Sequence, residues 1–211
     1  VLMDEINWSD RLIAIKGGRG VGKTDFLLNY AKELRTTNPE LSQRTLYVNF
    51  NDFYFTEHSL VEFAGEFVAA GGHTLLIDQA FKYPNWSREL GQCYYRYPNL
   101  HIIFTASSVM RLVEDNKDLG SIVHPYNLRG FSFIEYLNLT LGLKIPVYQL
   151  EDILQNHVDI AHRISQNIRP LDYFENYLHH GYYPLFLEPH DFSESLLKMI
   201  NMILEVDVLL I

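Results

Sequence analysis

The residues with the clearest chemical purpose lie near the start of the chain, where positions 17–24 read G-x-x-x-x-G-K-T. Glycines let backbone N–H groups turn inward around an anion, and a helix that starts here adds the positive end of its dipole. The lysine of this pattern reaches phosphate oxygens, and the threonine hydroxyl is a ligand for Mg²⁺. The segment therefore predicts an ATP and Mg²⁺ site formed by Gly17, Gly18, Arg19, Gly20, Val21, Gly22, Lys23, Thr24 and Asp25.

Apolar runs flank this glycine-rich segment on both sides. Positions 12–15 read L-I-A-I before it, and positions 26–31 read F-L-L-N-Y-A after it. These runs predict a strand, a loop and a helix, which is the context that the motif needs in order to bind phosphate. The alternative is a glycine-rich turn that binds nothing.

An acidic residue closes a second apolar run, 54 positions after Thr24. Residues 73–77 are mainly apolar and Asp78 follows them. In phosphate-loop enzymes an acidic residue at such a strand end holds Mg²⁺, so we predict that Thr24 and Asp78 are the metal-binding pair. The competing interpretation makes Asp78 a helix cap or a turn residue.

The elements that must position these residues alternate between strand and helix. Strands are predicted at 11–16, 45–50, 73–78, 100–105 and 122–128, and helices at 23–36, 60–70, 84–97 and 107–113. Alternation of this kind indicates a parallel sheet with helices on both faces. We predict an α/β fold of the P-loop NTPase type, with the ligand beyond the carboxyl ends of the strands.

The pattern changes after Gly130, where only helical periodicity continues. Helices are predicted at 131–141, 149–166, 170–179 and 191–210. We therefore predict a nucleotide-binding domain at 1–130 and an all-helical lid at 131–211. The sequence stops inside an apolar pattern, so we expect a fragment of a longer protein.

Charge is spread unevenly along the chain, which carries a net charge of −9. Residues 1–130 hold 13 Lys and Arg against 15 Asp and Glu, whereas residues 131–211 hold four against 11. The acidic second part makes direct nucleic-acid binding unfavourable. The single cysteine, Cys93, excludes an internal disulfide. The chain has neither a long apolar run nor a leader pattern, so we expect a cytoplasmic protein without a membrane span.

Several stretches together resemble prokaryotic AAA-family P-loop ATPases of the additional-strand class, which usually carry a nuclease-like C-terminal domain. The stretches are 17–24, 75–78, 82–90, 103–108 and 128–136. The resemblance implies an acidic pair after the third strand, with an Asp for Mg²⁺ and a Glu that activates water. This chain has Gln79 at the second position, which implies slow or impaired ATP hydrolysis. Ser107 matches the family's γ-phosphate sensor, although a helix N-cap is an equal alternative.

Other positions also depart from the family pattern. Asp25 replaces a second Thr, Ala106 replaces a Gly, and residues 118–121 lack an expected Arg pair. Arg88, Arg96 and Arg111 remain as candidates for a transition-state arginine, with solvated helix charges as the simpler interpretation. The Gln79 substitution could be natural or engineered.

Three functions stay open at this point. The chain could be an ATP-binding switch, an ATPase that a neighbouring subunit completes, or a small-molecule kinase. A homo-oligomer and a protein partner bound through the helical part are both possible. The nine histidines have no spacing that indicates a metal site.

Overall fold

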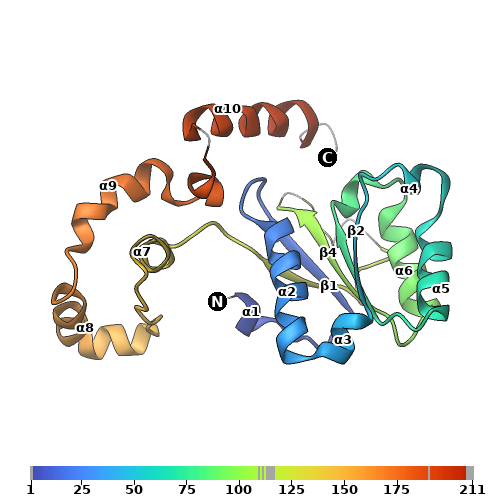
Figure 1. Cartoon of the computed structure of the whole chain (residues 1–211), viewed down its shortest axis with the longest axis horizontal. Coiled ribbons are helices and arrows are strands. Elements are labelled where there is room, and N and C mark those ends of the chain that lie inside the picture. The colour runs from blue at the N-terminus through green and yellow to red at the C-terminus, as the bar shows by residue number, and fades with distance from the viewer. Residues whose placement is uncertain (1, 109, 111, 113–116, 190, 208–211) are drawn as a thin grey trace. The chain divides into compact units, whose positions relative to one another are not determined.

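A five-stranded parallel sheet forms the centre of the first part of the chain (Figure 1). The computed structural model describes residues 2–108, 110, 112, 117–189 and 191–207. The strands are β1 (Leu12–Gly17), β2 (Thr45–Asn49), β3 (Thr74–Asp78), β4 (His101–Ser107) and β5 (His124–Asn127). Their order is β2-β3-β4-β1-β5, and every neighbouring pair is parallel. The predicted α/β fold is confirmed, and the carboxyl ends of all strands meet at one edge.

Helices cover both faces of this sheet (Figure 1). Alternate residues of a strand point to opposite faces, so β1 contributes to two cores. Its residues Ile13 and Ile15 pack with Leu27 of α2 (Lys23–Thr37). Leu12 and Ala14 belong to the core on the other face, which α5 (Leu60–Ala69) and α6 (Trp86–Arg96) cover. This two-sided burial explains why β3 and β4 read as continuous apolar runs.

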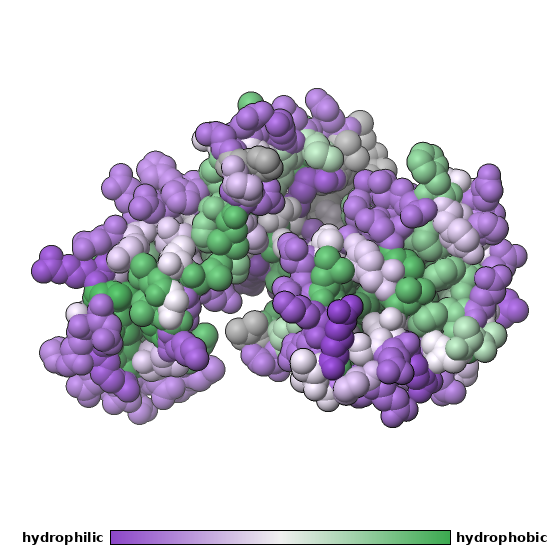
Figure 2. Space-filling view, viewed as in Figure 1, coloured by the Kyte–Doolittle hydropathy of each residue, from purple (hydrophilic) through white to green (hydrophobic). Residues whose placement is uncertain are grey.

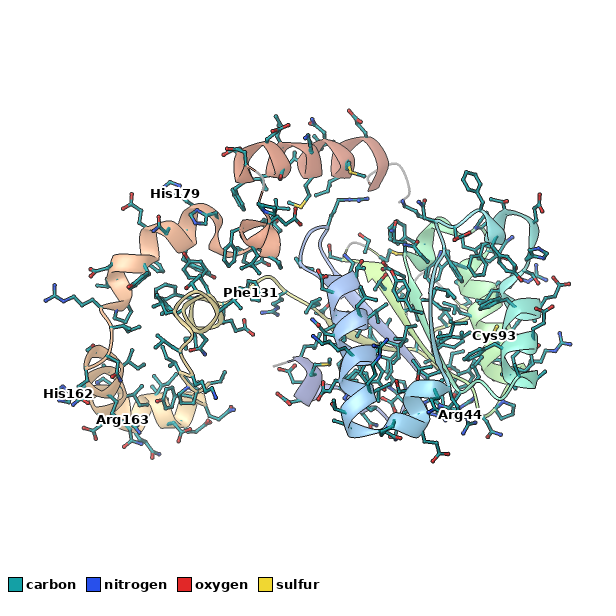
Figure 3. All side chains as sticks on the ribbon, viewed as in Figure 1. Arg44, Cys93, Phe131, His162, Arg163 and His179 are labelled. Atoms are coloured by element: carbon teal, nitrogen blue, oxygen red, sulfur yellow. The ribbon has the colours of Figure 1, made fainter. Side chains whose placement is uncertain are left out.

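Cys93 is on α6, and its side chain lies in the core that this helix covers (Figure 3). Its side chain is fully buried, and burial raises the pKa of the thiol to about 12. A thiol that stays protonated is a poor nucleophile, so Cys93 acts as a small core residue.

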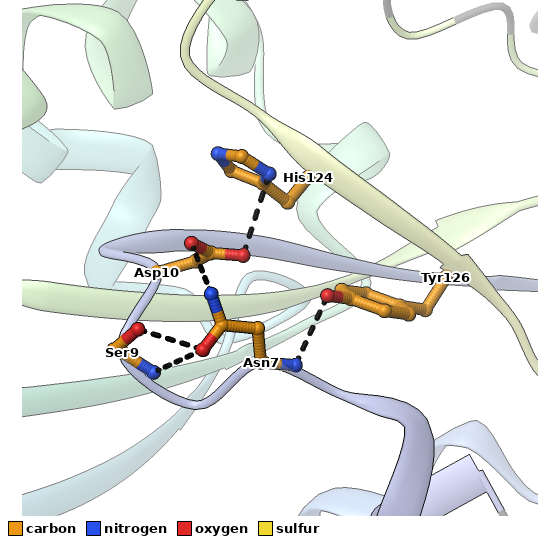
Figure 4. Close-up of polar contacts among 5 residues, drawn as sticks. All are labelled: Asn7, Ser9, Asp10, His124 and Tyr126. Atoms are coloured by element: carbon orange, nitrogen blue, oxygen red, sulfur yellow. Dashed lines mark hydrogen bonds and ion pairs between the residues drawn. The ribbon is translucent and has the colours of Figure 1, made fainter.

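The N-terminal segment is tied to β5 by polar contacts (Figure 4). The backbone N–H of Asn7 donates to the Tyr126 hydroxyl at 3.0 Å. Asp10 lies 3.3 Å from the imidazole of His124. Asn7 and Asp10 come after the short helix α1 (Leu2–Glu5) in the chain, and their contacts hold the segment that leads into β1.

β5 is one of the two edge strands of the sheet and is only four residues long. Its Pro125 lies opposite Ala14 in the parallel register with β1. Just beyond the strand, Leu128 N–H donates to the carbonyl oxygen of Lys16 at 2.7 Å. The outer side of β5 pairs with no other strand of the described chain.

Several predicted boundaries were wrong. A new helix, α3 (Pro39–Gln43), starts where the chain was predicted only to leave α2, because Asn38 caps it through Leu41 N–H. A short helix that was not predicted, α4 (Tyr54–Glu57), follows β2. A 3₁₀ turn, η1 (Ala80–Lys82), follows β3. The predicted helix at 107–113 does not start at Ser107, because β4 continues to that residue in register with Gly17.

Contacts divide the chain into two compact units. Unit 1 comprises the chain up to Arg129 together with the segment that begins at Ile203, and unit 2 comprises Gly130–Met202. The helices from unit 2 onward are α7 (Phe133–Leu141), α8 (Leu150–Ser165), η2 (Pro170–Tyr173), α9 (Phe174–Asn176), η3 (Tyr177–Gly181), η4 (Pro184–Leu187), α10 (Phe192–Met202) and η5 (Ile203–Asp207).

The helices of unit 2 are less regular than the sequence predicted. The stretch 170–179, predicted as one helix, is divided among a 3₁₀ turn, a short α-helix and a π-helical turn. Its aromatic residues pack on α7, where Tyr177 lies 5.2 Å from Phe133 and 5.5 Å from Tyr136 between ring centroids. The predicted helix at 191–210 becomes π-helical at Ile203, and its residues 208–210 lie outside the described part.

Many apolar side chains of unit 2 stay on its surface, and Figure 2 shows such green patches among its helices. The buried apolar residues described in unit 2 are Tyr136, Leu137, Ile160 and Met199. In the described chain, no helix combines the length and the apolar character needed to cross a membrane.

Candidate functional site

The glycine loop connects the end of β1 to the start of α2 at the carboxyl edge of the sheet. Gly20 and Gly22 have φ angles of 80° and 91°, a left-handed region that glycine adopts without strain. A Cβ on Gly17 would lie only 2.6 Å from the carbonyl oxygen of Leu128. Gly22 is also the N-cap of α2 and has no side chain to bond the first N–H groups of that helix. These N–H groups are the donors that the motif predicted for an anion.

Lys23 lies over the loop that precedes it. Its ammonium donates to the carbonyl oxygens of Gly17 at 2.9 Å and Gly18 at 2.7 Å. Val21 is buried, whereas the next turn of the chain exposes Thr24 and Asp25. The predicted phosphate-binding residues therefore form one continuous segment that leads from the strand into the helix. They are Gly17, Gly18, Arg19, Gly20, Val21, Gly22, Lys23, Thr24 and Asp25.

The predicted metal-binding pair is in direct contact. The hydroxyl of Thr24 donates to Oδ2 of Asp78 at 2.7 Å. The two residues are 54 positions apart in sequence and come from α2 and β3. Since β4 lies between β1 and β3, this contact bridges over the strand that separates the two motifs.

Asp78 is almost fully buried and accepts four hydrogen bonds. Oδ2 accepts from Thr24 and, at 3.0 Å, from the hydroxyl of Tyr47 in β2. Oδ1 accepts from the hydroxyl of Thr105 in β4 at 2.7 Å and from the backbone N–H of Gln79 at 3.0 Å. The carboxylate is thus fixed by donors from four separate elements or turns.

Tyr47 is a site residue that the sequence did not indicate, and Thr105 was predicted only as the last residue of a strand that ends at this edge of the sheet. Burial, together with the charge of Asp78 and the hydrogen bond to it, raises the pKa of Tyr47 to about 12. Thr105 is 1% exposed and also accepts a hydrogen bond from Gln79 N–H at 2.8 Å. A polar threonine at the end of the predicted apolar strand 100–105 was a usable signal, whereas the contact of Tyr47 with Asp78 depends on which strand neighbours β3.

Gln79 is half-buried and directly follows β3. Its φ and ψ of 56° and 41° place it in the left-handed region, where a residue with a Cβ is strained. Strain of this kind is concentrated at functional sites. The conformation breaks the strand direction immediately after Asp78, at the edge where the glycine loop also lies.

Ser107 ends β4 opposite Gly17 in the strand register. The next residue, Ser108, donates its N–H to the Gly17 carbonyl at 3.1 Å, so this end of β4 is held against the glycine loop. Arg88 and Arg96 instead line a surface cleft of about 750 Å³ on α6, together with Lys117 and Asp118. None of the described residues in that cleft belongs to the glycine loop. Arg111 lies outside the described residues.

The residues present suit a magnesium nucleotide. Mg²⁺ prefers oxygen ligands and is commonly held through one or two carboxylates together with substrate phosphates. Thr24 and Asp78 supply a hydroxyl and one carboxylate at a single point, and the amide groups and ammonium of the loop supply donors for phosphate oxygens. These side chains and backbone groups therefore have the chemistry needed to bind both Mg²⁺ and the phosphates of a nucleotide.

Comparison with known proteins gives one family match and several similar folds. Residues 9–137 match a family model described as an AAA domain. Similar solved structures include Aeropyrum pernix Orc1 in complex with DNA, with 15% identity, a TM-score of 0.45, and coverage of 62% of this chain and 42% of that one. The AMPPCP-bound DnaA of Aquifex aeolicus has 18% identity and a TM-score of 0.41, covering 74% and 55%. C. elegans PCH-2 has 19% identity and a TM-score of 0.44, covering 65% and 40%.

These similarities are limited in extent. The chain spans between 40% and 55% of the length of these structures. No curated protein matches the sequence.

Proposed function

Because the chain belongs to the AAA domain family of ATP-binding proteins, we propose that residues 17–24 bind ATP with Mg²⁺ and that hydrolysis is slow. The observation that carries the proposal is the 2.7 Å hydrogen bond between Thr24 and Asp78. A glycine loop that bound nothing would have no need of a buried carboxylate at the start of its helix. The contact therefore favours a metal–nucleotide site over a plain turn.

Each residue has a definite task in this proposal. The loop N–H groups and the Lys23 ammonium bind the β- and γ-phosphates. Thr24 and Asp78 hold Mg²⁺, which neutralises charge on the phosphates. Ser107, at the end of the strand beside β1, contacts the γ-phosphate. Residues 1–130 would form the nucleotide-binding domain and residues 131–211 the lid.

Gln79 limits the rate because its amide can orient water but cannot accept a proton from it. A positioned general base contributes about 10²–10⁴ in rate. Nucleotide binding survives this loss, because the phosphate and metal contacts come from other residues. We infer that the bound state, rather than turnover, is the output of the domain. An alternative is that a neighbouring copy supplies the missing base or an arginine.

The decisive experiment compares the chain with its Gln79→Glu variant. MgATP affinity is measured by calorimetry, and phosphate release is measured under saturating ATP. We expect similar affinity for both and turnover that is about 10²–10⁴ faster in the variant. Gln92→Glu is the matched control, since Gln92 is exposed on α6 and receives the same charge change.

Two results would count against the proposal. Equal turnover in the chain and in Gln79→Glu would show that residue 79 is not limiting, and a concentration-dependent rate would then point to completion by another copy. Failure of Lys23→Ala to weaken MgATP binding would remove the glycine loop from the site.

For a longer form of the protein, we expect a nuclease-like domain after these residues.

A further inference from the structure

The geometry points to Tyr47 as a competitor for the carboxylate that holds the metal. We propose that the Tyr47 hydroxyl must leave Asp78 before Mg²⁺ can bind fully, so that Tyr47 raises the Mg²⁺ concentration needed for nucleotide binding. The inference rests on the proposed function of the glycine loop. It adds a residue from β2 that sets the metal requirement of that site.

Asp78 accepts as many hydrogen bonds as its carboxylate can hold. A carboxylate has about four lone-pair positions for hydrogen bonds. Thr24 and Tyr47 occupy those of Oδ2, and Thr105 and the N–H of Gln79 occupy those of Oδ1. Asp78 can therefore accept a bond from the hydration shell of Mg²⁺, which the ion largely keeps in proteins, only after one donor leaves.

Three of the four donors to Asp78 are held in place or can stay when the metal binds. The Gln79 donor is backbone and cannot withdraw without moving the end of β3. Thr105 is 1% exposed and is also held by the Gln79 N–H at 2.8 Å. Thr24 can keep its bond, because a hydroxyl that donates its proton to Asp78 still has lone pairs for the metal.

Tyr47 is the donor that fits the role. Its bond to Oδ2 is 3.0 Å long, against 2.7 Å for each of the two threonine hydroxyls. It is half-buried and comes from β2, an edge strand of the sheet. A rotation of its side chain opens a position on the same oxygen that Thr24 contacts.

The test measures the Mg²⁺ dependence of nucleotide binding in Tyr47→Phe. Calorimetry with a non-hydrolysable ATP analogue is repeated over a series of Mg²⁺ concentrations and once in EDTA. Loss of a competing hydrogen bond of ordinary strength should lower the Mg²⁺ midpoint about fivefold. Affinity in EDTA should not change, because the hydrogen bond that Tyr47→Phe removes goes to the metal-binding carboxylate.

The control is Tyr126→Phe, which removes a tyrosine hydroxyl that accepts from Asn7 at 3.0 Å on β5. Its Mg²⁺ midpoint should equal that of the parent chain. Tyr47→Met, which also lacks the hydroxyl, should shift the midpoint in the same direction, and thermal unfolding without ligand shows whether each variant is folded.

Three outcomes would overturn the inference. An unchanged midpoint in both Tyr47 variants would mean that the hydroxyl does not compete, and a raised midpoint would mean that it supports metal binding. Either result leaves the proposed function intact. Nucleotide binding that is absent from the parent chain in Mg²⁺ would overturn the proposed function together with the inference.

Discussion

Apolar residues are buried in strand β3 of unit 1 but are mostly exposed in helix α8 of unit 2. Every residue of β3 is buried, and its side chains enter the cores on both faces of the sheet. In α8 only Ile160 is buried, whereas Leu150, Ile153, Leu154 and Val158 are between 43% and 69% exposed. β3 reads as a continuous apolar run and α8 has apolar residues at helical spacing, and each pattern predicts a packed element.

The difference shows what periodicity can and cannot reveal. A strand within a sheet is flanked by bonded neighbours, and crossover helices cover its faces, so an apolar strand in this fold is covered almost by necessity. A helix satisfies its own backbone and can form with its apolar face open. Unit 1 therefore has a core of its own, whereas unit 2 relies on local aromatic contacts such as Phe133 with Tyr177.

The largest expected effect tests this contrast with one substitution in each unit. Leu90→Ala, at a fully buried position on α6, should lower the free energy of unfolding by about 2–5 kcal/mol. Leu154→Ala, at a position 69% exposed on α8, should change it by no more than about 0.5 kcal/mol. Denaturant unfolding followed by fluorescence and circular dichroism measures both, and the fluorescence reports unit 1, where Trp8 and Trp86 lie. Equal losses would mean that the apolar face of α8 is covered.

A second test asks whether the polar centre of unit 1 is as tightly built as its apolar core. Asp78→Ala leaves several donors without an acceptor, among them the buried Thr105 hydroxyl, so stability should fall by about 1–3 kcal/mol. Asp25→Ala is the matched control, because that carboxylate is exposed on the first turn of α2 and contributes at most about 1 kcal/mol through the helix dipole. Thermal unfolding in EDTA keeps metal binding out of the comparison. A larger loss in Asp25→Ala would contradict the assignment of Asp78 as the structural centre.

A third comparison uses a backbone conformation that both units contain. Gln79 in unit 1 and Gly142 after α7 in unit 2 have φ angles of 56° and 64°. Gln79→Gly should raise stability by up to about 1 kcal/mol, since removal of the Cβ relieves strain and costs some unfolded-state entropy. Gly142→Ala should lower it by about 1 kcal/mol. A lower melting temperature for Gln79→Gly together with a higher one for Gly142→Ala would contradict this account of the two turns.

The smallest expected effect is a pH dependence of unit 1. His73 and His101 stack with ring centroids 4.6 Å apart near the starts of β3 and β4. Burial lowers the pKa of both, helped by Arg44 at His73 and by His73 and Arg11 at His101. The unfolded chain then binds more protons than the folded chain, so stability rises with pH and is lost as pH falls below about 6.5.

Tryptophan fluorescence during unfolding at pH 7.5 and pH 5.5 measures this loss in unit 1. The double variant His73→Gln with His101→Gln should show a smaller difference between the two pH values. If the variant keeps the full pH dependence, the proton uptake occurs at other groups.

The sequence predicted unit 1 better than unit 2 for reasons that particular residues make clear. Strong local signals, the glycine loop and the apolar runs that end in Asp78, located the strands and the Thr24–Asp78 contact. The bond from Tyr47 could not be predicted, because it depends on β2 lying next to β3. Strand order is a property of the whole sheet and leaves no mark on one strand.

In unit 2 the periodicity predicted helices but not their interruptions. Residues 170–179 carry apolar side chains at helical spacing, yet the chain changes from 3₁₀ to α to π geometry there. Gly181, the last residue of η3, lies so close to Tyr136 that an added Cβ would meet its ring at 2.8 Å. Tertiary packing thus overrides local preference at this point, and no single-residue signal reports it.

The proline in β5 has a consequence for how copies of the chain can associate. Because Leu128 N–H points to β1, strand alternation turns the N–H side of positions 125 and 127 outward. Pro125 has no hydrogen to offer there, so the open edge lacks a donor that an incoming strand would need. Pairing of β5 with an edge strand of another molecule, which could join copies of the sheet into a fibre, is therefore disfavoured.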